Sequence, residues 1–287
     1  MGAVAVGLAY DRAGEGGVPL LLVHGWPETR RIWTRNVAPL AEAGFDVVAP
    51  DLRGFGDSPI ADDGFYDLAA HARDLEALCR SLGWEWCHAC GGDLGGGAII
   101  DLGLRFEGLV RRQVLFNCVL PIVEGLPPVP AHVLQAADYF VRQGRDADAL
   151  ASELRTAEER RRYVAAFYGS RFWATPGAFT PAEAAWHAEP FGDAEKLRAG
   201  FGNYESALGS RPLSEAPRFF ERVAVETVAL YGPDDHVIWE DFPERCELVF
   251  ENLVGPFVVP RAGHFLQWER AELLNRTLAA FLRDPID

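Results

Sequence analysis

Six short apolar runs recur along this chain, and longer amphipathic stretches separate most of them. The runs have the length and continuous apolar character of strands that are buried on both faces of a sheet. Their alternation with helical stretches predicts an α/β fold with a mostly parallel, doubly wound sheet. We expect strands at residues 19–23, 45–49, 84–90, 113–117, 227–231 and 256–259. We expect helices at residues 31–43, 66–82, 95–106 and 266–283.

The alternation stops between residues 117 and 227, where no clear strand pattern occurs. This part of the chain begins near a turn-rich run, Gly-Leu-Pro-Pro-Val-Pro at residues 125–130, and is rich in aromatic side chains. We expect residues 121–221 to form a helical cap that is inserted into a core made of residues 1–120 and 222–287. The length of 287 residues suits one core with one large insertion.

Composition excludes several classes of partner. The net charge of −15 would repel a phosphate backbone, so nucleic acid is not expected to bind. Neither a signal sequence nor a run of about 18 apolar residues occurs, which predicts a cytoplasmic protein with no membrane partner. The Cys-His-Ala-Cys motif at residues 87–90 falls in an expected strand, where residues three apart point to opposite faces, so we expect neither a zinc site nor a redox pair. The chain is expected to act as a monomer or a homodimer.

An aspartate, Asp93, stands at the centre of the segment Gly-Gly-Asp-Leu-Gly-Gly at residues 91–96. This segment directly follows an expected strand and directly precedes an expected helix. Small residues two positions before and after the centre, Gly91 and Gly95, permit the sharp turn of a nucleophile elbow. An aspartate that only caps a helix is the structural alternative.

Two further polar residues follow the last expected strands. Asp235 follows the run at 227–231, and His264 follows the run at 256–259. The chain order of nucleophile, acid and histidine is the one that accompanies a nucleophile elbow, and side chains at the carboxyl ends of parallel strands converge. We therefore predict Asp93 as the nucleophile, His264 as the base and Asp235 as the acid that orients the histidine. Asp234 is the alternative acid, and Asn117, at the end of the preceding strand, carries no charge.

The segment His-Gly-Trp-Pro at residues 24–27 ends the first strongly apolar run. A backbone N–H at this position can face the elbow. We assign the oxyanion hole to the backbone amides of Trp26 and Leu94. The peptide bond before Pro27 could be cis.

These segments together resemble the epoxide hydrolase branch of the α/β-hydrolases, a branch that also contains haloalkane dehalogenases. The resemblance lies in His-Gly-Trp-Pro at 24–27, Asp-Leu-Arg-Gly-Phe-Gly-Asp-Ser at 51–58, the aspartate elbow and Gly-His-Phe at 263–265. It covers essentially the whole chain and is strongest in the core. It implies an α/β-hydrolase fold and a hydrolase acting on ether bonds, which opens a small hydrophobic epoxide to a vicinal diol with water and without metal or organic cofactor.

The resemblance extends to two segments of the cap. Residues 139–144 and 202–204 are similar to the segments in which this family places two lid tyrosines. This implies that Tyr139 and Tyr204 donate hydrogen bonds to the epoxide oxygen. Tyr163 and Tyr168 are the alternatives, and any cap tyrosine could instead serve only packing.

The sequence departs from the family pattern at three positions. Gly92 stands where the family often has His, Leu94 where it usually has Trp, and Glu205 where Arg commonly follows the second tyrosine. We expect these changes to widen the floor of the pocket. The aromatic side chains expected to contact the substrate are those of Trp26, Phe265 and Trp186.

A carboxylate nucleophile predicts a covalent ester on Asp93 that is hydrolysed by water activated by His264. A haloalkane or haloacid dehalogenase would use the same triad, but Leu94 replaces the Trp that commonly binds halide. Fluoroacetate-type enzymes place arginines at and after this position, where the chain has Leu94 and Gly97. A non-catalytic ligand receptor on the same fold, the alternative of another class, would be expected to tolerate loss of a triad member, and none is lost here. A serine esterase is disfavoured because the elbow has no serine.

Overall fold

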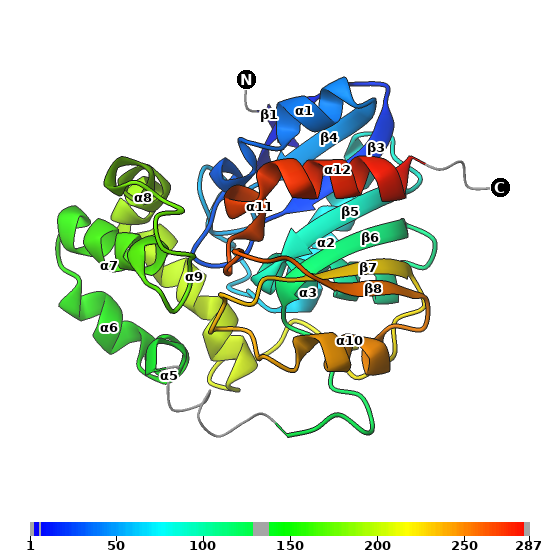
Figure 1. The fold of residues 1–287 in the computed structure, drawn as a ribbon. Helices are drawn as coiled ribbons and strands as arrows, with labels where there is room; N and C mark the ends of the chain where they lie inside the picture. Colours follow the sequence, from blue (N-terminus) through cyan, green and yellow to red (C-terminus); the bar gives the residue numbers. More distant parts are fainter. Residues whose placement is uncertain (1–2, 6, 129–137, 284–287) are drawn as a thin grey trace.

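A computed structural model describes residues 3–5, 7–128 and 138–283 of the chain. Its centre is an eight-stranded sheet with the strand order β1-β2-β4-β3-β5-β6-β7-β8 (Figure 1). The strands from β4 and β3 through β8 are parallel, whereas β1 and β2 pair antiparallel at one edge. The strands are β1 Ala3–Ala5, β2 Leu8–Ala13, β3 Val18–Val23, β4 Phe45–Pro50, β5 Cys87–Gly92, β6 Val110–Cys118, β7 Glu226–Tyr231 and β8 Leu253–Val258.

The expected α/β architecture with a mostly parallel sheet is confirmed, and all six predicted strands are present. Helices cover both faces of the inner parallel strands, which is why β4 is buried along its whole length, whereas the edge strand β8 is largely exposed. Strands β1 and β2 were not predicted from the sequence. Strand β2 carries Asp11 and Arg12 in its middle and is only half-buried at its end, so it has no continuous apolar run.

The core helices are α1 Val37–Glu42, α2 Leu68–Ser81, α3 Asp93–Arg105, α10 Phe242–Val249, α11 Leu266–Glu269 and α12 Ala271–Leu282. Helices α1 and α12 lie together on one face of the sheet, and α2 and α3 lie together on the other (Figure 1). Two predicted helices are divided. Residues 31–43 form a 3-10 turn, Arg30–Trp33, followed by α1, and the Thr34 hydroxyl donates to the Arg31 carbonyl where the turn ends. Non-helical backbone at Arg270, with a φ of −130° and a ψ of 38°, separates α11 from α12.

The segment between β6 and β7 forms a cap of helices at the carboxyl ends of the parallel strands, on the left of Figure 1. No strand occurs in this segment within the described residues. Side-chain capping boxes start two of the helices, with Thr156 before α7 and Thr180 before α8. The expected cap limits, 121 and 221, remain a prediction, and residues 129–137 lie outside the described residues. The cap elements are α5 Asp138–Arg145, α6 Ala147–Glu153, α7 Ala157–Gly169, α8 Pro181–Ala188, the 3-10 turn Glu189–Gly192 and α9 Ala194–Ala207.

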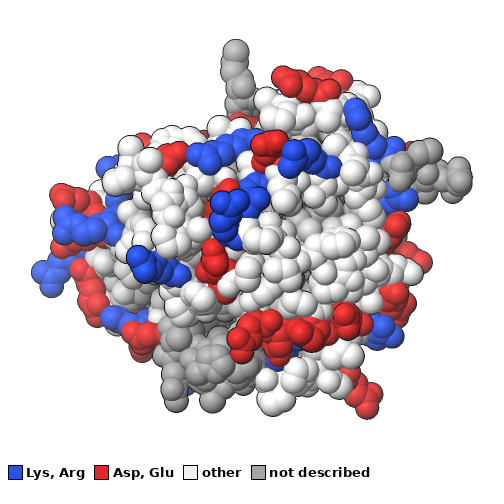
Figure 2. All heavy atoms as spheres, in the orientation of Figure 1, with Lys and Arg blue, Asp and Glu red and all other residues white. Residues whose placement is uncertain are grey.

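The surface carries both signs of charge. On the face shown in Figure 2, acidic and basic side chains form small groups around a broad uncharged area, with no large basic patch on that face. Among the helices of the described residues, none is long and apolar enough to cross a membrane.

Candidate active site

Asp93 lies at a tight turn between β5 and α3. Its φ of 48° is in the left-handed region, which side chains other than glycine rarely adopt. The turn also requires close approach of the backbone. A Cβ added to Gly95 would lie 2.3 Å from the carbonyl oxygen of Val23, and one added to Gly91 would lie 2.9 Å from the same atom. The glycines on either side of Asp93 therefore allow the elbow that the sequence predicted.

The structure brings the three predicted triad residues together. The Nε2 atom of His264 lies 3.5 Å from Oδ2 of Asp93, and its Nδ1 lies 2.9 Å from Oδ2 of Asp235. His264 and Asp235 are buried, whereas the side chain of Asp93 is 14% exposed. The alternative acid, Asp234, instead accepts a hydrogen bond from the Thr175 hydroxyl of the cap at 3.1 Å. The geometry therefore favours Asp235 as the partner of the histidine.

Asn117 is a member of the site whose role the sequence analysis missed. It ends β6 with a φ of 36°, and its Nδ2 donates to Oδ2 of Asp235 at 2.8 Å. The same amide group contacts Gly232 through both of its polar atoms, because Oδ1 accepts from the Gly232 N–H at 2.8 Å and Nδ2 donates to its carbonyl at 3.2 Å. Asn117 thus joins β6 to the loop that carries the acid. The sequence signal for this role was the position of Asn117 at the end of an expected strand.

The loop that carries His264 is held from two sides. From the core, the carboxylate of Glu269 accepts hydrogen bonds from the N–H groups of Gly263 at 2.9 Å and Phe265 at 3.1 Å. From the cap, the carbonyl of Trp173 accepts from the His264 N–H at 2.7 Å, and the Trp173 ring meets the imidazole edge-on at 4.7 Å. Neither Glu269 nor Trp173 was singled out from the sequence, because their roles depend on contacts between distant segments.

The predicted oxyanion loop lies against the nucleophile. The Trp26 N–H donates to Oδ1 of Asp93 at 2.7 Å, and the Trp26–Pro27 bond is cis. Leu94 lies in the first turn of α3, where backbone N–H groups have no partner within the helix. His24 fixes the loop, since its Nε2 accepts from the Leu52 N–H at 2.9 Å and its Nδ1 then donates to the Gly25 carbonyl at 2.9 Å. Burial lowers the pKa of His24 to about 4, which keeps the imidazole neutral in this role.

The charges of the triad act on one another. Burial alone would lower the pKa of His264. The charge of Asp235, its hydrogen bond to the imidazole and the carboxylate of Asp93 outweigh burial, so the pKa of His264 is raised well above 6.5. The surroundings of His264 therefore favour the protonated imidazole.

Asp93 faces a cavity of about 530 Å³ between the core and the cap. Tyr139 of α5 and Tyr204 of α9 line this cavity, and their rings meet edge-to-face at 5.9 Å. The alternatives, Tyr163 and Tyr168, are not among its described lining residues. The Tyr163 hydroxyl accepts from the side chain of Gln143 at 2.9 Å, and the Tyr168 hydroxyl donates to the Pro27 carbonyl. Of the four cap tyrosines considered, Tyr139 and Tyr204 are thus the two that share a cavity with the elbow.

Two of the three aromatic residues expected to contact substrate lie elsewhere. Trp26 lines the cavity, but Phe265 and Trp186 do not belong to its described lining. Phe265 is fully buried and stacks on Tyr168 at 4.7 Å. Trp186 is 40% exposed on α8, with the guanidinium of Arg31 5.2 Å from its ring. The structure thus does not place these two side chains in the described lining of this cavity, and aromatic character alone cannot separate packing from substrate contact.

The expected widening of the pocket floor also needs correction. A Cβ added to Gly92 would lie 2.3 Å from the ring of Phe116, so this ring already fills the space beside the glycine. Glu205 forms ion pairs with Arg198 and Arg211 at 2.8 Å and is not among the described lining residues. Of the three departures from the family pattern, only Leu94 lines the cavity.

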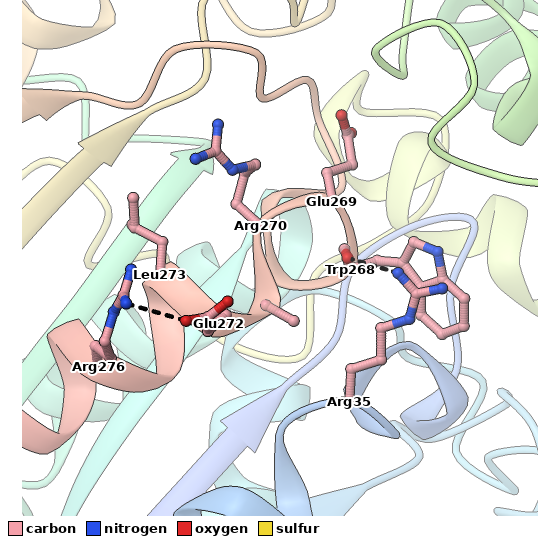
Figure 3. Close-up of a pocket in the computed structure, with 8 residues that line it drawn as sticks. Arg35, Trp268, Glu269, Arg270, Glu272, Leu273 and Arg276 are labelled. Atoms are coloured by element: carbon pink, nitrogen blue, oxygen red, sulfur yellow. Dashed lines mark hydrogen bonds and ion pairs between the residues drawn. The ribbon is translucent and has the colours of Figure 1, made fainter.

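A second, smaller hollow of about 290 Å³ lies beside α11 and α12 (Figure 3). Its arginines already have partners within the protein. The guanidinium of Arg35 stacks on the Trp268 ring at 3.7 Å and Arg276 pairs with Glu272 at 3.0 Å. No triad residue lines it among the residues described.

Cys87 and Cys90 lie in β5, the strand in which they were predicted, and both are buried. The Sγ atoms of Cys87 and Cys79 lie 4.0 Å apart. Within the described ranges, no group of three or more His, Cys, Asp or Glu side chains is arranged to hold a metal ion.

Comparison with known proteins identifies the class of the chain. The profile of the alpha/beta hydrolase fold matches residues 18–271, and the chain belongs to this family. It is 27% identical over 275 residues to the soluble epoxide hydrolase of Corynebacterium sp. (strain C12), an alignment that covers 95% of this chain and 92% of the relative. The solved structure of the epoxide hydrolase CorEH without ligand superposes with a TM-score of 0.85 at 25% identity and covers 98% of this chain and 97% of that one.

A more local similarity is higher. The fluoroacetate dehalogenase of Burkholderia sp. is 44% identical over 87 residues, which are 29% of this chain and 28% of that protein. These similarities, together with the contacts of His264 to Asp93 and Asp235, support a hydrolase. They also indicate two reactions, epoxide hydrolysis and dehalogenation, for which the carboxylate nucleophile has to be tested.

Proposed function

We propose that this chain is an epoxide hydrolase that forms a covalent ester on Asp93. The observation that carries the proposal is that a carboxylate nucleophile on the core and two tyrosine phenols on the cap line one cavity. A carboxylate can attack an sp³ carbon, and phenols can protonate the oxygen that leaves it. The similarity to the soluble epoxide hydrolase of Corynebacterium along nearly the whole chain supports the same conclusion.

In the first half-reaction, an oxygen of Asp93 attacks one carbon of the epoxide. A new C–O ester bond forms, the ring C–O bond breaks, and the departing oxygen takes a proton from Tyr139 or Tyr204. Burial and the charge of Asp93 raise the pKa of both phenols well above 10, so both are protonated donors at neutral pH. The phenol recovers its proton from solvent.

Formation of the ester prepares the base for the second half-reaction. The ester of Asp93 carries no charge, so His264 loses one of the two carboxylates that raise its pKa. The imidazole can then release its proton and accept one from water. Asp235 continues to orient the ring through Nδ1 at 2.9 Å.

The water attacks Cγ of the Asp93 ester and produces a tetrahedral oxyanion. The backbone amides of Trp26 and Leu94 stabilise this oxyanion, with a contribution of about 3 kcal/mol per donor in comparable sites. Collapse of the intermediate breaks the bond between Cγ of Asp93 and the ester oxygen, and this oxygen leaves with the diol. The carboxylate of Asp93 is restored. The oxygen that enters the diol in the first turnover therefore comes from Asp93.

A dehalogenase is the second candidate because of the local similarity to the fluoroacetate enzyme. It would use the same triad but would need a donor for the departing halide. Leu94, the residue after the nucleophile, has no N–H or O–H group in its side chain. The two phenols in the cavity therefore favour an epoxide over a halide as the leaving group.

A side-by-side assay tests the proposal. Purified protein is incubated with styrene oxide, 1-chlorobutane and fluoroacetate, and diol and free halide are both measured. We expect diol from the epoxide and little halide from either of the other two. Halide release that exceeds diol formation would assign the chain to the dehalogenases, and the absence of both products would favour a binding protein.

A further inference from the structure

The cavity extends from the nucleophile along one face of α3. Asp93, Asp101 and Arg105 all line it, and they are separated by eight and four residues. Because residues four apart share a face of a helix and each residue rises 1.5 Å, Asp101 lies about 12 Å and Arg105 about 18 Å along the axis from Asp93. The cavity is therefore elongated, with the reacting end at Asp93 and a distal end at Arg105.

Between its two ends the cavity is apolar. Leu68, Val119 and Phe219 are among its lining residues, and its rim includes Ile122, 66% exposed, and Phe220, 58% exposed. A volume of about 530 Å³ holds about 18 non-hydrogen atoms if each takes the roughly 30 Å³ of a water molecule in the liquid. A small epoxide would leave most of this space empty. An elongated apolar substrate fills it and reaches the distal end.

The distal end contains an arginine, Arg105, each of whose three guanidinium nitrogens donates to a partner in the protein. The Nε of Arg105 donates to Asp101, its Nη1 donates to Glu215 at 2.9 Å, and its Nη2 donates to the carbonyl of Ala216 at 3.0 Å. The side chains of Arg105 and Asp101 are 8% and 1% exposed. Two carboxylates thus surround one guanidinium, and a third, Asp67, also lines the cavity.

The other arginine of the described lining, Arg245, also has partners in the protein. Its Nε pairs with Asp241 at 2.8 Å and its Nη2 donates to the Pro127 carbonyl at 2.9 Å. A carboxylate at the distal end would therefore lose its hydration, meet a guanidinium that is already paired with two carboxylates, and lie near Asp101 and Glu215. Burial of an anion without a partner is costly, and like charges increase the cost.

We propose that the distal end of this cavity selects substrates by charge, so that elongated epoxides with a neutral end are accepted and those ending in a carboxylate are rejected. Asp101 and Glu215 are the specificity-determining residues, because they pair with Arg105, the guanidinium that lines the described cavity at that end. The assignment of Asp93 as the reacting end rests on the proposed function. Charge selection deepens that function by naming the substrate class.

Binding of two unreactive probes tests charge selection independently of catalysis. Undecanamide and undecanoate have the same chain length and similar end groups, but only the second carries a charge. Calorimetry at neutral pH should show that wild-type protein binds the amide at least about tenfold more tightly, the change that corresponds to about 1.4 kcal/mol. Equal binding, or tighter binding of undecanoate, would overturn the proposal.

A variant tests the residues that are responsible. Glu215→Gln frees one edge of Arg105, so its affinity for undecanoate should rise about tenfold while its affinity for undecanamide changes little. The double variant Glu215→Gln with Arg105→Gln should lose that gain. Glu221→Gln is the matched control, because Glu221 pairs with Arg218 at 2.7 Å and does not line the described cavity. An unchanged preference in Glu215→Gln would remove Glu215 from the role, and the wild-type comparison decides the proposal if that variant does not fold.

Turnover of the matched epoxides separates this proposal from the proposed function. The substrates are 10,11-epoxyundecanamide and 10,11-epoxyundecanoate. Conversion of both with equal kcat/KM would refute charge selection and leave epoxide hydrolysis standing. Conversion of neither, with the tenfold difference between the probes intact, would refute the proposed reaction and leave charge selection standing.

Discussion

Asn117 and His264 donate to the same oxygen of Asp235. The Nδ2 of Asn117 lies 2.8 Å from Oδ2 of Asp235, and the Nδ1 of His264 lies 2.9 Å from it. The other carboxylate oxygen, Oδ1, accepts from the Val237 N–H at 2.7 Å. The carboxylate is thus fixed at both oxygens, and the histidine has one orientation in which it meets both Asp235 and Asp93.

Replacement of Asn117 by glycine should impair hydrolysis of the ester. Glycine tolerates the φ of 36° and removes only the side-chain contacts. Loss of buried hydrogen bonds of about 1 to 3 kcal/mol corresponds to a decrease in kcat of about 5- to 150-fold. With one donor fewer on its carboxylate, Asp235 should raise the pKa of His264 further, so the pH at which kcat is half-maximal should rise. Asn252→Gly, which removes a single exposed contact to the Ala224 carbonyl, is the control. An unchanged pH profile would refute a positioning role for Asn117.

Asp93→Asn should abolish turnover and leave the fold intact. The amide has nearly the shape of the carboxylate, but it is a poor nucleophile. Activity is measured on freshly purified protein, mass spectrometry excludes deamidation, and circular dichroism checks the fold. Full activity in the verified Asp93→Asn variant would eliminate this residue as the nucleophile.

Tyr139→Phe and Tyr204→Phe should each slow the first half-reaction, and the double variant should be nearly inactive. Each change removes one donor to the developing alkoxide, at a cost of about 1 to 3 kcal/mol per phenol. Single-turnover kinetics with excess enzyme measure this step. Tyr163→Phe is the matched control, because that hydroxyl contacts Gln143 and not the cavity. If the double variant retains most of its activity, another donor protonates the epoxide oxygen.

His264→Gln should separate the two half-reactions. Asp93 can attack an epoxide without a base, but water requires one to attack the ester. Intact-protein mass spectrometry after incubation with styrene oxide should show one added substrate mass, and peptide mapping should locate it on the segment containing Asp93. In heavy-oxygen water, the first diol released by the wild type should contain unlabelled oxygen from the carboxylate. Label in that first diol, with no adduct on the variant, would mean direct attack by water.

A buried glutamate below the triad should make folding stability depend on pH. Glu28 accepts hydrogen bonds from the Gly25 N–H and the Gln267 side chain, both at 2.7 Å, and burial raises its pKa from 4.5 to about 7. The folded state therefore favours protonated Glu28, and this stabilisation is complete below pH 4.5 and is lost as the pH rises through about 7.

Glu28→Gln tests this dependence. Urea denaturation should show that the variant gains about 2 to 3 kcal/mol relative to wild type between pH 4.5 and pH 8. The free Oε1 of Gln267 is buried without a partner and can accept from the new amide, so the variant should fold. A difference between the two proteins that does not change with pH would mean that Glu28 stays charged in the folded state.

The sequence was sufficient for the core because parallel strands buried on both faces leave continuous apolar runs. It was also sufficient to find Asp93, Asp235 and His264, since each follows such a strand and the flanking glycines mark the elbow. Strand β2, which lies next to the edge of the sheet, was missed because its polar residues interrupt the pattern.

The remaining parts of the site depend on contacts between segments that are distant in the sequence. Glu269 and Trp173 act through backbone atoms of the histidine loop, and backbone contacts leave no periodic signal. Whether Trp186 faces solvent or a cavity depends on how the cap helices pack. The ion pair of Arg105 with Glu215 spans 110 positions, so its effect on the cavity becomes visible only in the folded chain.

The hydrogen bond from the His264 N–H to the carbonyl of Trp173 has a consequence for the exchange of caps between related enzymes. A chimera that keeps every triad residue but receives a foreign cap would lose one of the two supports of its histidine loop. The points at which two sequences are joined would have to be chosen so that the residues around Trp173 and the core come from the same parent. Variation in cap sequence and length should therefore concentrate in the outer helices, while this short stretch is inherited together with the catalytic base.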